Sequence, residues 1–209
     1  MRAITREAIE TVALAVFFVL LIQATVSNYR VEGPSMDATL HDLDRVLVNK
    51  VLYMEIDAER VAGLIPGLDA ADGEVWHPFG APERGDIIVF RYPLNPRENF
   101  VKRVIGLPGD RVRLERGTVY VNDEPLEEPY ISIEHATTQT LPERTVEPGT
   151  YYVLGDNRQQ SDDSRHWGAV PAENIVGKVW VTYWPMGNIA ALFASVSGSL
   201  GVVSPSTAG

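Results

Sequence analysis

The sequence contains no cysteine and very little lysine. Without cysteine, the 209-residue chain can form no disulfide, no thiolate metal site and no thiol nucleophile. Lys50, Lys102 and Lys178 are the only lysines, against 15 arginines. Because arginine stays protonated, chemistry that needs a neutral amine can use only these lysines. An excess of positive charge is also missing, since the net charge is −10, and this argues against a nucleic-acid partner.

An uncharged and strongly apolar run covers residues 11–29. As a helix it would span about 28 Å, close to the ~30 Å hydrocarbon thickness of a bilayer, so it predicts a transmembrane anchor. A cleaved signal peptide is the alternative, but its apolar stretch is shorter, roughly 7–15 residues, and Thr25-Val26-Ser27 is a poor cleavage site. A weak positive-inside bias favours the cytoplasmic side for residues 1–10.

Short segments rich in β-branched and aromatic residues follow, which predicts a β domain over residues 30–187. The expected strands cover residues 45–51, 86–92, 100–105, 150–154 and 175–184. Val112 and Leu114 alternate before Arg116-Gly117, and Val119 and Val121 after it, which indicates a hairpin. The predicted fold class is therefore mainly β, with an N-terminal transmembrane helix followed by a catalytic domain of antiparallel β-sheets and an inserted β-ribbon subdomain at about 111–148.

Three stretches carry weaker signals. Residues 52–84 predict a short helix near 57–65 and then irregular chain, and residues 123–148 predict an extended ribbon or loop. The tail, 188–209, is small and apolar and then rich in Ser and Pro. We expect it to lie on a surface or to be disordered, and a second membrane span over 189–203 is the alternative.

Two residues could carry nucleophilic chemistry. Ser35 stands in Gly33-Pro34-Ser35-Met36, which is not the Gly-x-Ser-x-Gly elbow of α/β-hydrolases, and by itself would only indicate a turn. Lys102 shares its strand face with Phe100 and Val104. Burial there would lower the pKa of the amine from ~10.4 towards neutrality, and a neutral amine can accept a proton from a serine hydroxyl. The alternative is an edge lysine whose long stem reaches water.

A polar loop, GDNRQQSDDSR at 155–165, follows the strand expected at 150–154. Its alternating aspartates and arginines are typical of ion pairs that fix a loop. A calcium loop is the alternative, but the EF-hand spacing of glycine and glutamate is not met.

Three segments in this order resemble the hallmark boxes of type I signal peptidases. They are GPSMDATL at 33–40, GDIIVFRYP with FVKRVIGLPGD between 85 and 110, and GDNRQQSDDSRHWG at 155–168. DRVLVNK at 44–50 adds support, and the similarity runs from the anchor to about Gly187. The spacing of the segments together makes the resemblance specific, although each segment alone is weak.

The resemblance implies a Ser-Lys dyad that needs no metal or cofactor. Ser35 matches the nucleophile, Lys102 matches the general base, and Ser161 matches a serine whose hydroxyl orients the amine. The supporting residues that it implies are Asp156, Arg158, Asp163, Arg165 and Arg103. The substrate-binding residues that it implies are Val31, Glu32 and Gly33, in a strand that would pair with the substrate, and Met36 beside the nucleophile.

Three positions differ from the family pattern. Some relatives carry serine where Gly33 stands, so here only backbone N–H groups, chiefly that of Ser35, can hold the oxyanion. The family often has proline in place of Ala38 and glycine in place of Leu43, which concerns the shape of the turn after the nucleophile.

By resemblance, the chain is a membrane-bound serine endopeptidase that removes N-terminal signal peptides from exported preproteins. Its expected partners are signal peptides with small residues at −1 and −3 and the lipid bilayer. The expected location is the plasma membrane of a bacterium, with a single span and the catalytic domain on the outer, periplasmic or extracellular, side.

Three other readings compete with this one. A Ser-His-Asp triad would need a histidine such as His166 beside Ser35. A self-cleaving Ser-Lys protease like the stress-response repressors would need a DNA-binding helix pair, which the sequence lacks, and would not need an anchor. A membrane-tethered β domain could bind extended peptides by strand addition without catalysis, but it would have no need of Ser35, Lys102 and Ser161 together.

Overall fold

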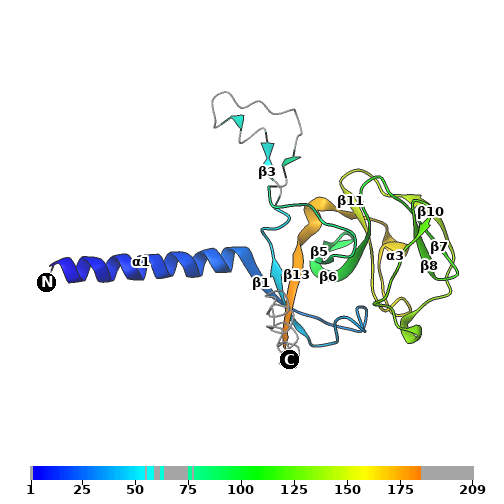
Figure 1. The fold of residues 1–209 in the computed structure, drawn as a ribbon, viewed down its shortest axis with the longest axis horizontal. Coiled ribbons are helices and arrows are strands. Elements are labelled where there is room, and N and C mark those ends of the chain that lie inside the picture. Colours follow the sequence, from blue (N-terminus) through cyan, green and yellow to red (C-terminus); the bar gives the residue numbers. More distant parts are fainter. Residues whose placement is uncertain (1, 55, 59–61, 64–74, 77, 185–209) are drawn as a thin grey trace, which may run out of the picture.

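The computed structural model describes residues 2–54, 56–58, 62–63, 75–76 and 78–184. Helix α1, Arg2–Thr25, extends away from a β domain that contains most of the remaining described chain (Figure 1). Within the described ranges, no helix is both long enough and apolar enough to cross a membrane. The predicted tail at 188–209 and most of the predicted helix near 57–65 lie outside the described residues.

The helix predicted over residues 11–29 is too long at its carboxyl end. Helix α1 ends at Thr25, and strand β1, Val26–Arg30, follows it directly. Strand β1 pairs antiparallel with β2, Arg45–Asn49. The β-branched and polar residues at this boundary are poor helix formers, and the backbone hydrogen bonds to β2 favour the extended form. The uncharged part of the helix is therefore residues 11–25.

A seven-stranded antiparallel sheet forms the centre of the domain, in the order β1-β2-β13-β5-β6-β11-β12. Besides β1 and β2, its strands are β5 Ile87–Tyr92, β6 Asn95–Gly106, β11 Thr150–Leu154, β12 Val170–Pro171 and β13 Ile175–Trp184. The strands expected from the sequence are confirmed, with two main changes in length. Strand β2 stops at Asn49, because the Asn49 side-chain oxygen accepts hydrogen bonds from the N–H groups of Val51 and Leu52 and turns the chain. Strand β6 begins earlier than expected, since it forms a hairpin with β5.

A four-stranded antiparallel sheet forms the ribbon, in the order β10-β7-β8-β9. Its strands are β7 Arg111–Glu115, β8 Thr118–Val121, β9 Glu124–Pro125 and β10 Leu141–Thr145. The predicted hairpin of β7 and β8 is confirmed. Its turn residues, Arg116 and Gly117, have φ of 49° and 87°, as the twist of a two-residue hairpin turn requires. Only glycine fits at 117, because a Cβ there would lie 1.8 Å from the Thr137 carbonyl oxygen.

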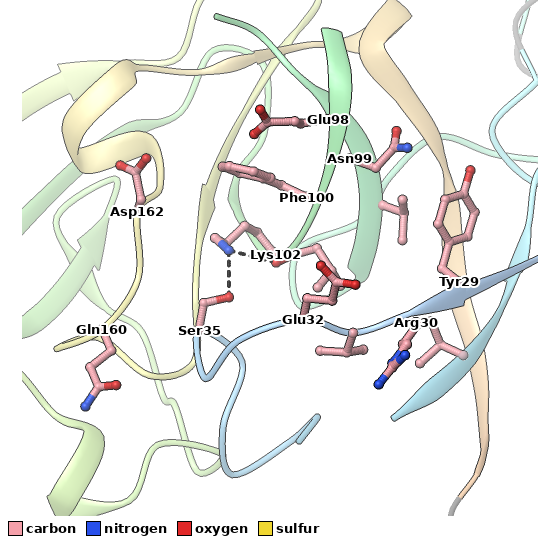
Figure 2. Close-up of a pocket in the computed structure, with 14 residues that line it drawn as sticks. Tyr29, Arg30, Glu32, Ser35, Glu98, Asn99, Phe100, Lys102, Gln160 and Asp162 are labelled. Carbon is pink, nitrogen blue, oxygen red and sulfur yellow. Dashed lines mark hydrogen bonds between the residues drawn. The ribbon is translucent and has the colours of Figure 1, made fainter. Parts of the chain in front are cut away.

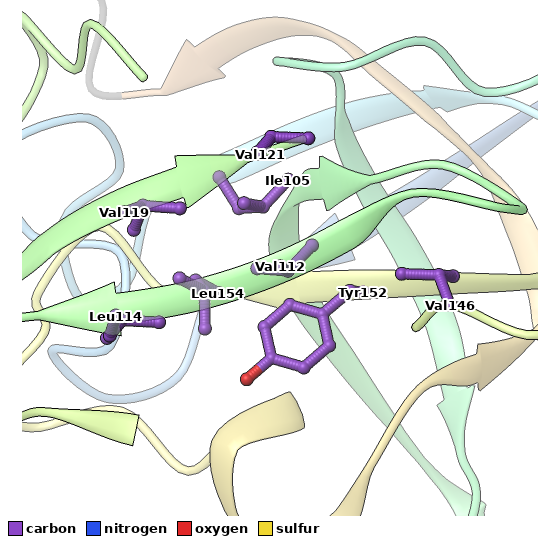
Figure 3. Close-up of a cluster of buried hydrophobic side chains, with 8 residues drawn as sticks. All are labelled: Ile105, Val112, Leu114, Val119, Val121, Val146, Tyr152 and Leu154. Atoms are coloured by element: carbon purple, nitrogen blue, oxygen red, sulfur yellow. The ribbon is translucent and has the colours of Figure 1, made fainter. Parts of the chain in front are cut away.

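Alternating apolar residues join the ribbon to the large sheet (Figure 3). Ile105 of β6 belongs to this cluster, whereas its neighbour Val104 packs in a second cluster with Ile88 and Phe90. Successive residues of a strand point to opposite faces, so β6 is covered on both sides. This double cover fixes the strand that carries Lys102.

The remaining elements are short. Strands β3 Ile56–Asp57 and β4 Val75–Trp76 pair with each other, and the helical turns are η1 Ile133–His135, α3 Ser164–Trp167 and η2 Ala172–Asn174. The fold is mainly β with antiparallel sheets, as the sequence predicts.

Candidate active site

Ser35 lies in a tight turn between β1 and β2. The backbone N–H of Leu40 donates to the Met36 carbonyl oxygen at 2.8 Å, and Asp37 N–H donates to the Pro34 carbonyl at 3.0 Å. Met36 is fully buried and packs in a core cluster with Leu40 and with Val46 of β2. This buried side chain anchors the turn beside the partly exposed Ser35.

Lys102 projects from β6 to Ser35. Its Nζ lies 2.8 Å from Ser35 Oγ and donates a second hydrogen bond to the Val101 carbonyl oxygen at 3.0 Å (Figure 2). The side chain is buried, with 4% of the residue exposed. His166, which the triad reading would need, forms an exposed pair with Asp162 instead, at 3.3 Å. The amine of Lys102 therefore occupies the position of a base for Ser35.

Burial lowers the pKa of Lys102 to about 8. The charges of Asp163, Asp162 and Asp156 act in the opposite direction, and that of Arg165 lowers the pKa further. An amine with an unperturbed pKa of ~10.4 would be less than about 1% neutral at pH 8. With the lowered value, about half of the Lys102 amines are neutral at pH 8 and can accept a proton.

Two buried ion pairs support the site. Arg103 donates from Nε and Nη2 to the two carboxylate oxygens of Asp156, at 2.8 and 2.6 Å. Arg165 holds Asp163 in the same bidentate manner, at 2.7 and 2.8 Å. Burial by itself would raise the pKa of Asp163, but the hydrogen bonds and charge of Arg165 outweigh it and hold this pKa below its ordinary value.

The loop at 155–165 contacts the nucleophile turn through its backbone. The N–H of Asn157 donates to the Ser35 carbonyl oxygen at 3.1 Å. Arg158 Nε donates to the Gly155 carbonyl at 3.0 Å. A Cβ at Gly155 would lie 2.4 Å from the Ser35 carbonyl oxygen and 2.2 Å from Ser161 Oγ, so only glycine allows this approach.

Ser161 does not make its expected contact. Its Oγ is buried and is not hydrogen-bonded to Lys102 Nζ; the hydroxyl acts on Asp163 instead, where it helps to lower the pKa of that carboxyl. The hydrogen bonds of Lys102 Nζ go to Ser35 Oγ and to the Val101 carbonyl instead. The expected hydrogen bond between Ser161 and Lys102 is therefore not formed in this structure.

A groove of about 590 Å³ contains the Ser35–Lys102 pair (Figure 2). Residues 29–32 line one side, and residues 98–102 of β6 line the other. Gln160 and Asp162 lie beyond Ser35, and Val46 and Val89 contribute apolar surface. The side chains of Ser35 and Lys102 are thus both accessible from this groove.

The predicted substrate-binding residues divide into two groups. Val31 and Glu32 line the groove, whereas Gly33 and Met36 do not. Met36 is fully buried and cannot contact a substrate, so its assignment to substrate binding is wrong, and its role is to anchor the turn. Gly33, with φ of 85°, donates its N–H to the side chain of Asp42 at 2.8 Å.

Residues 31–33, which the resemblance implies would pair with the substrate, lie outside the strands of the structure, and their pairing with a substrate stays a prediction. Strand β1 ends at Arg30. Beyond it, Val31 N–H donates to the Asp44 carbonyl at 2.8 Å, and its carbonyl accepts from Leu43 N–H at 3.0 Å. The backbone groups of Val31 are thus already used inside the chain.

The turn after Ser35 contains two non-glycine residues with left-handed backbone. Ala38 has φ of 82° and Leu43 has φ of 71°. At position 43 the family pattern often has glycine, which adopts this conformation without the cost of roughly 1–2 kcal/mol that another residue incurs. At position 38 the pattern often has proline, whose ring fixes φ near about −65°. The turn of this chain therefore differs in shape from a proline-containing one.

Sequence reasoning did not identify several residues of the site. Phe100 could have been found, because it lies on the same strand face as Lys102, and its ring centroid is 5.4 Å from Nζ. Thr39, which donates to Asp156 at 2.5 Å, lies within the recognised segment at 33–40. Glu128 and Tyr130 carry no such signal, since they contact Arg158 and Arg103 only through the fold.

Comparison with known proteins gives a consistent family. Residues 5–184 match the family model described as signal peptidase, peptidase S26. The chain is 38% identical over 195 residues to signal peptidase I of Leptolyngbya laminosa, which covers 89% of this chain and 83% of that protein. It is 38% identical over 183 residues to signal peptidase I of Bacillus caldolyticus, covering 80% and 84%. The crystal structure of a signal peptidase I from Enterococcus faecalis is 37% identical, with a TM-score of 0.43, and covers 48% of this chain and 98% of that one.

Proposed function

The chain belongs to the signal peptidase family, peptidase S26, and is a serine endopeptidase; on this premise we propose that it removes N-terminal signal peptides from exported preproteins, with Ser35 as nucleophile and Lys102 as general base. One observation carries the dyad: the amine of a buried lysine lies 2.8 Å from the hydroxyl of Ser35. The shared name of the relatives supports signal peptides as the substrate.

The reaction is acyl transfer in two steps. Neutral Lys102 accepts the hydroxyl proton of Ser35 as Oγ attacks the scissile carbonyl carbon. The resulting ammonium gives that proton to the leaving amine when the carbon–nitrogen bond breaks, which leaves an ester on Ser35. Neutral Lys102 then deprotonates a water molecule that hydrolyses the ester and restores the serine.

The oxyanion is held by the backbone. Among the described residues, none accepts a hydrogen bond from the Ser35 N–H, so this donor is available to the substrate carbonyl oxygen. Gly33 offers no hydroxyl to assist it. By family resemblance, Ser161 is a candidate to orient the amine during proton transfer, and its Oγ is buried.

The substrate lies extended in the groove between residues 29–32 and β6. Strand β6 pairs with β5 along residues 99–103, while β11 begins its pairing with β6 only at Arg103. The other backbone edge of residues 98–101 is thus available to an added peptide strand. By family resemblance, the peptide carries small residues at −1 and −3, which suit shallow apolar surface such as Val31 and Val89.

We assign helix α1 the role of a single-pass anchor in the plasma membrane of a bacterium, with the β domain on the outer side. Its apolar side chains are exposed, for example Val12 at 62%, Phe17 at 58% and Ile22 at 61%. The uncharged helical residues, 11–25, extend about 22 Å, less than the ~30 Å hydrocarbon core, so the bilayer would thin around them. Digestion of vesicles with an added protease tests this topology. In intact vesicles that keep the orientation of the cell, the β domain should be digested and residues 1–10 should be protected. In opened vesicles, residues 1–10 should be accessible as well.

The test of the reaction compares four full-length chains on a synthetic preprotein with alanine at −1 and −3. Wild type and Lys50→Ala should cleave it at the same rate, because the Lys50 side chain makes no contact with the dyad. Ser35→Ala and Lys102→Ala should each lose activity by about 10³-fold or more. Cleavage by Lys102→Ala at the wild-type rate would contradict the mechanism. Binding of the peptide by wild type without cleavage would favour a β domain that only adds a strand.

A further inference from the structure

Glu128, in the segment between β9 and η1, forms a buried ion pair with the active-site loop. Both of its carboxylate oxygens accept hydrogen bonds from Arg158, from Nη1 at 3.1 Å and from Nη2. The side chains of Arg158 and Glu128 are 1% and 9% exposed. Bidentate pairing in such a buried place is geometrically demanding, so it fixes the guanidinium of Arg158.

Tyr130 contacts the other arginine of the site. Its ring centroid lies 3.8 Å from Cζ of Arg103, which places the guanidinium over the ring. Its hydroxyl donates to Glu128 at 2.7 Å. Glu128 and Tyr130 are therefore one connected unit that contacts two arginines.

Each of these arginines is one step from the dyad. Arg103 follows Lys102 on β6 and holds Asp156. Arg158 donates to the Gly155 carbonyl at 3.0 Å, and its neighbour Asn157 donates to the Ser35 carbonyl at 3.1 Å. The unit formed by Glu128 and Tyr130 thus reaches the base through β6 and the nucleophile through the loop.

The ribbon contains a matched arrangement that touches no part of the site. Arg113 of β7 lies over the ring of Tyr120 at 3.9 Å and pairs with Glu115 at 2.8 Å. The same three residue types make contacts of the same two kinds, here through one arginine and a single hydrogen bond, at more exposed positions, with side-chain exposures of 29% for Arg113 and 54% for Glu115. This arrangement supplies an internal control.

We propose that Glu128 and Tyr130 are positioning residues of the catalytic site. By holding Arg158 and Arg103, they set the distance between Ser35 Oγ and Lys102 Nζ and keep water away from the amine. This inference rests on the proposed function. Neither residue touches the reacting atoms, so they act through the arginines.

The expected consequence follows from the burial of the amine. If Tyr130 or Glu128 is removed, the arginine that it holds gains freedom, and the loop at 155–165 loosens over Lys102. Water then reaches the amine, and the pKa of Lys102 rises towards ~10.4. The charged groups that act on Lys102, namely Asp163, Asp162, Asp156 and Arg165, are unchanged in these variants.

The experiment uses full-length Tyr130→Leu, Tyr130→Phe and Glu128→Gln, with Tyr120→Leu and Glu115→Gln as matched controls. The first readout is kcat and KM on the synthetic preprotein as a function of pH. The second is independent of activity: trace acetylation of lysines by acetic anhydride at each pH, followed by mass spectrometry. The chain has three lysines, so Lys50 and Lys178 serve as internal standards for Lys102.

For Tyr130→Leu and Glu128→Gln, kcat at pH 7 should fall about tenfold, and the midpoints of the activity profile and of Lys102 acetylation should both rise by about one pH unit. KM should change by less than about twofold, because neither residue lines the groove and the binding of the substrate is retained. Tyr130→Phe keeps the ring and should stay within about twofold of wild type, as should both controls.

An unchanged acetylation midpoint in Tyr130→Leu, or a loss of kcat by the same factor at every pH, would overturn the proposal. Should Glu128→Gln fail to fold, Tyr130→Leu decides, since it removes no charge. If wild type cleaves no preprotein, the proposed function fails, whereas the acetylation midpoints still report whether these residues position Lys102.

Discussion

Two buried polar regions lie side by side in this domain and differ in how their charges are balanced. In the support region, each of the two buried aspartates, Asp156 and Asp163, is held by a bidentate arginine. In the dyad, the amine of Lys102 is hydrogen-bonded to a hydroxyl and a carbonyl, both uncharged. Only the second region holds a buried cation without a hydrogen-bonded carboxylate.

On our proposal, the difference separates the parts that maintain the structure from the part that reacts. A paired buried charge keeps its ordinary charge state, and removal of one partner leaves the other unbalanced. An unpaired buried amine instead loses its proton readily, and the pKa of Lys102 falls to about 8 for this reason. The dyad should therefore lower the folding stability and supply the activity, while the ion pairs should maintain the folding stability.

The largest effect expected from this comparison is on activity. Lys102→Met keeps the length and burial of the side chain but removes the base, so kcat should fall by about 10³-fold or more. Lys102→Arg should be equally inactive, because a guanidinium stays protonated. Appreciable turnover by the arginine variant in the preprotein assay would contradict a neutral amine.

Lys102→Met should also make the fold more stable. Since burial lowers the pKa of Lys102 in the folded chain, the unfolded chain binds the proton more tightly, and folding stability rises with pH between about 8 and 10.5. At pH 7 the full cost is present, so Lys102→Met should raise the free energy of unfolding by about 3 kcal/mol. At pH 11 the gain should vanish, which urea denaturation at both pH values measures.

The next effect, on stability, concerns the paired region. Asp163→Asn keeps the shape but leaves Arg165 buried without its carboxylate, which should lower the free energy of unfolding by about 3–5 kcal/mol. The control is Asp123→Asn, because Asp123 is 61% exposed and pairs with Arg111 at 2.6 Å. This variant should leave the urea midpoint unchanged. Equal midpoints for the two variants would remove the distinction between the regions.

The smallest effect tests the turn of Ser35 without altering any charge. Leu43 has φ of 71° and is 51% exposed, so its side chain contributes little packing. Leu43→Gly should relieve the backbone cost and stabilise the fold by about 0.5–1 kcal/mol. Leu94, which is 71% exposed and is not among the residues with positive φ, is the control: Leu94→Gly should not stabilise.

The elements with strong local signals could be predicted from the sequence. The hairpin of β7 and β8 follows from alternation around Arg116-Gly117, and the strand face of Lys102 follows from its apolar neighbours. Strand β1 was missed because residues 26–29 continue the uncharged run of the helix, while the β-branched and polar residues among them favour the extended form only weakly until they pair with β2. Local propensity cannot resolve such a case.

The same limit applies to the site. The resemblance implies Ser35, Lys102 and Ser161, but whether Ser161 reaches the amine depends on the exact placement of the loop at 155–165, which no motif encodes. The resemblance implies that Met36 lies beside the nucleophile, and the turn directs its side chain into the core. Glu128 and Tyr130 meet their arginines across long sequence separations, so only the folded chain reveals them.

The most direct test of the central claim, that Lys102 is a base because it is buried without a paired carboxylate, is its titration in the wild-type chain. Trace acetylation should give Lys102 a midpoint of about 8, and kcat/KM should rise with pH through the same midpoint. Lys50, in the same sample, serves as the reference. A Lys102 midpoint near the ordinary lysine value of about 10.4, or an activity that is flat from roughly pH 5 to 9, would contradict the account.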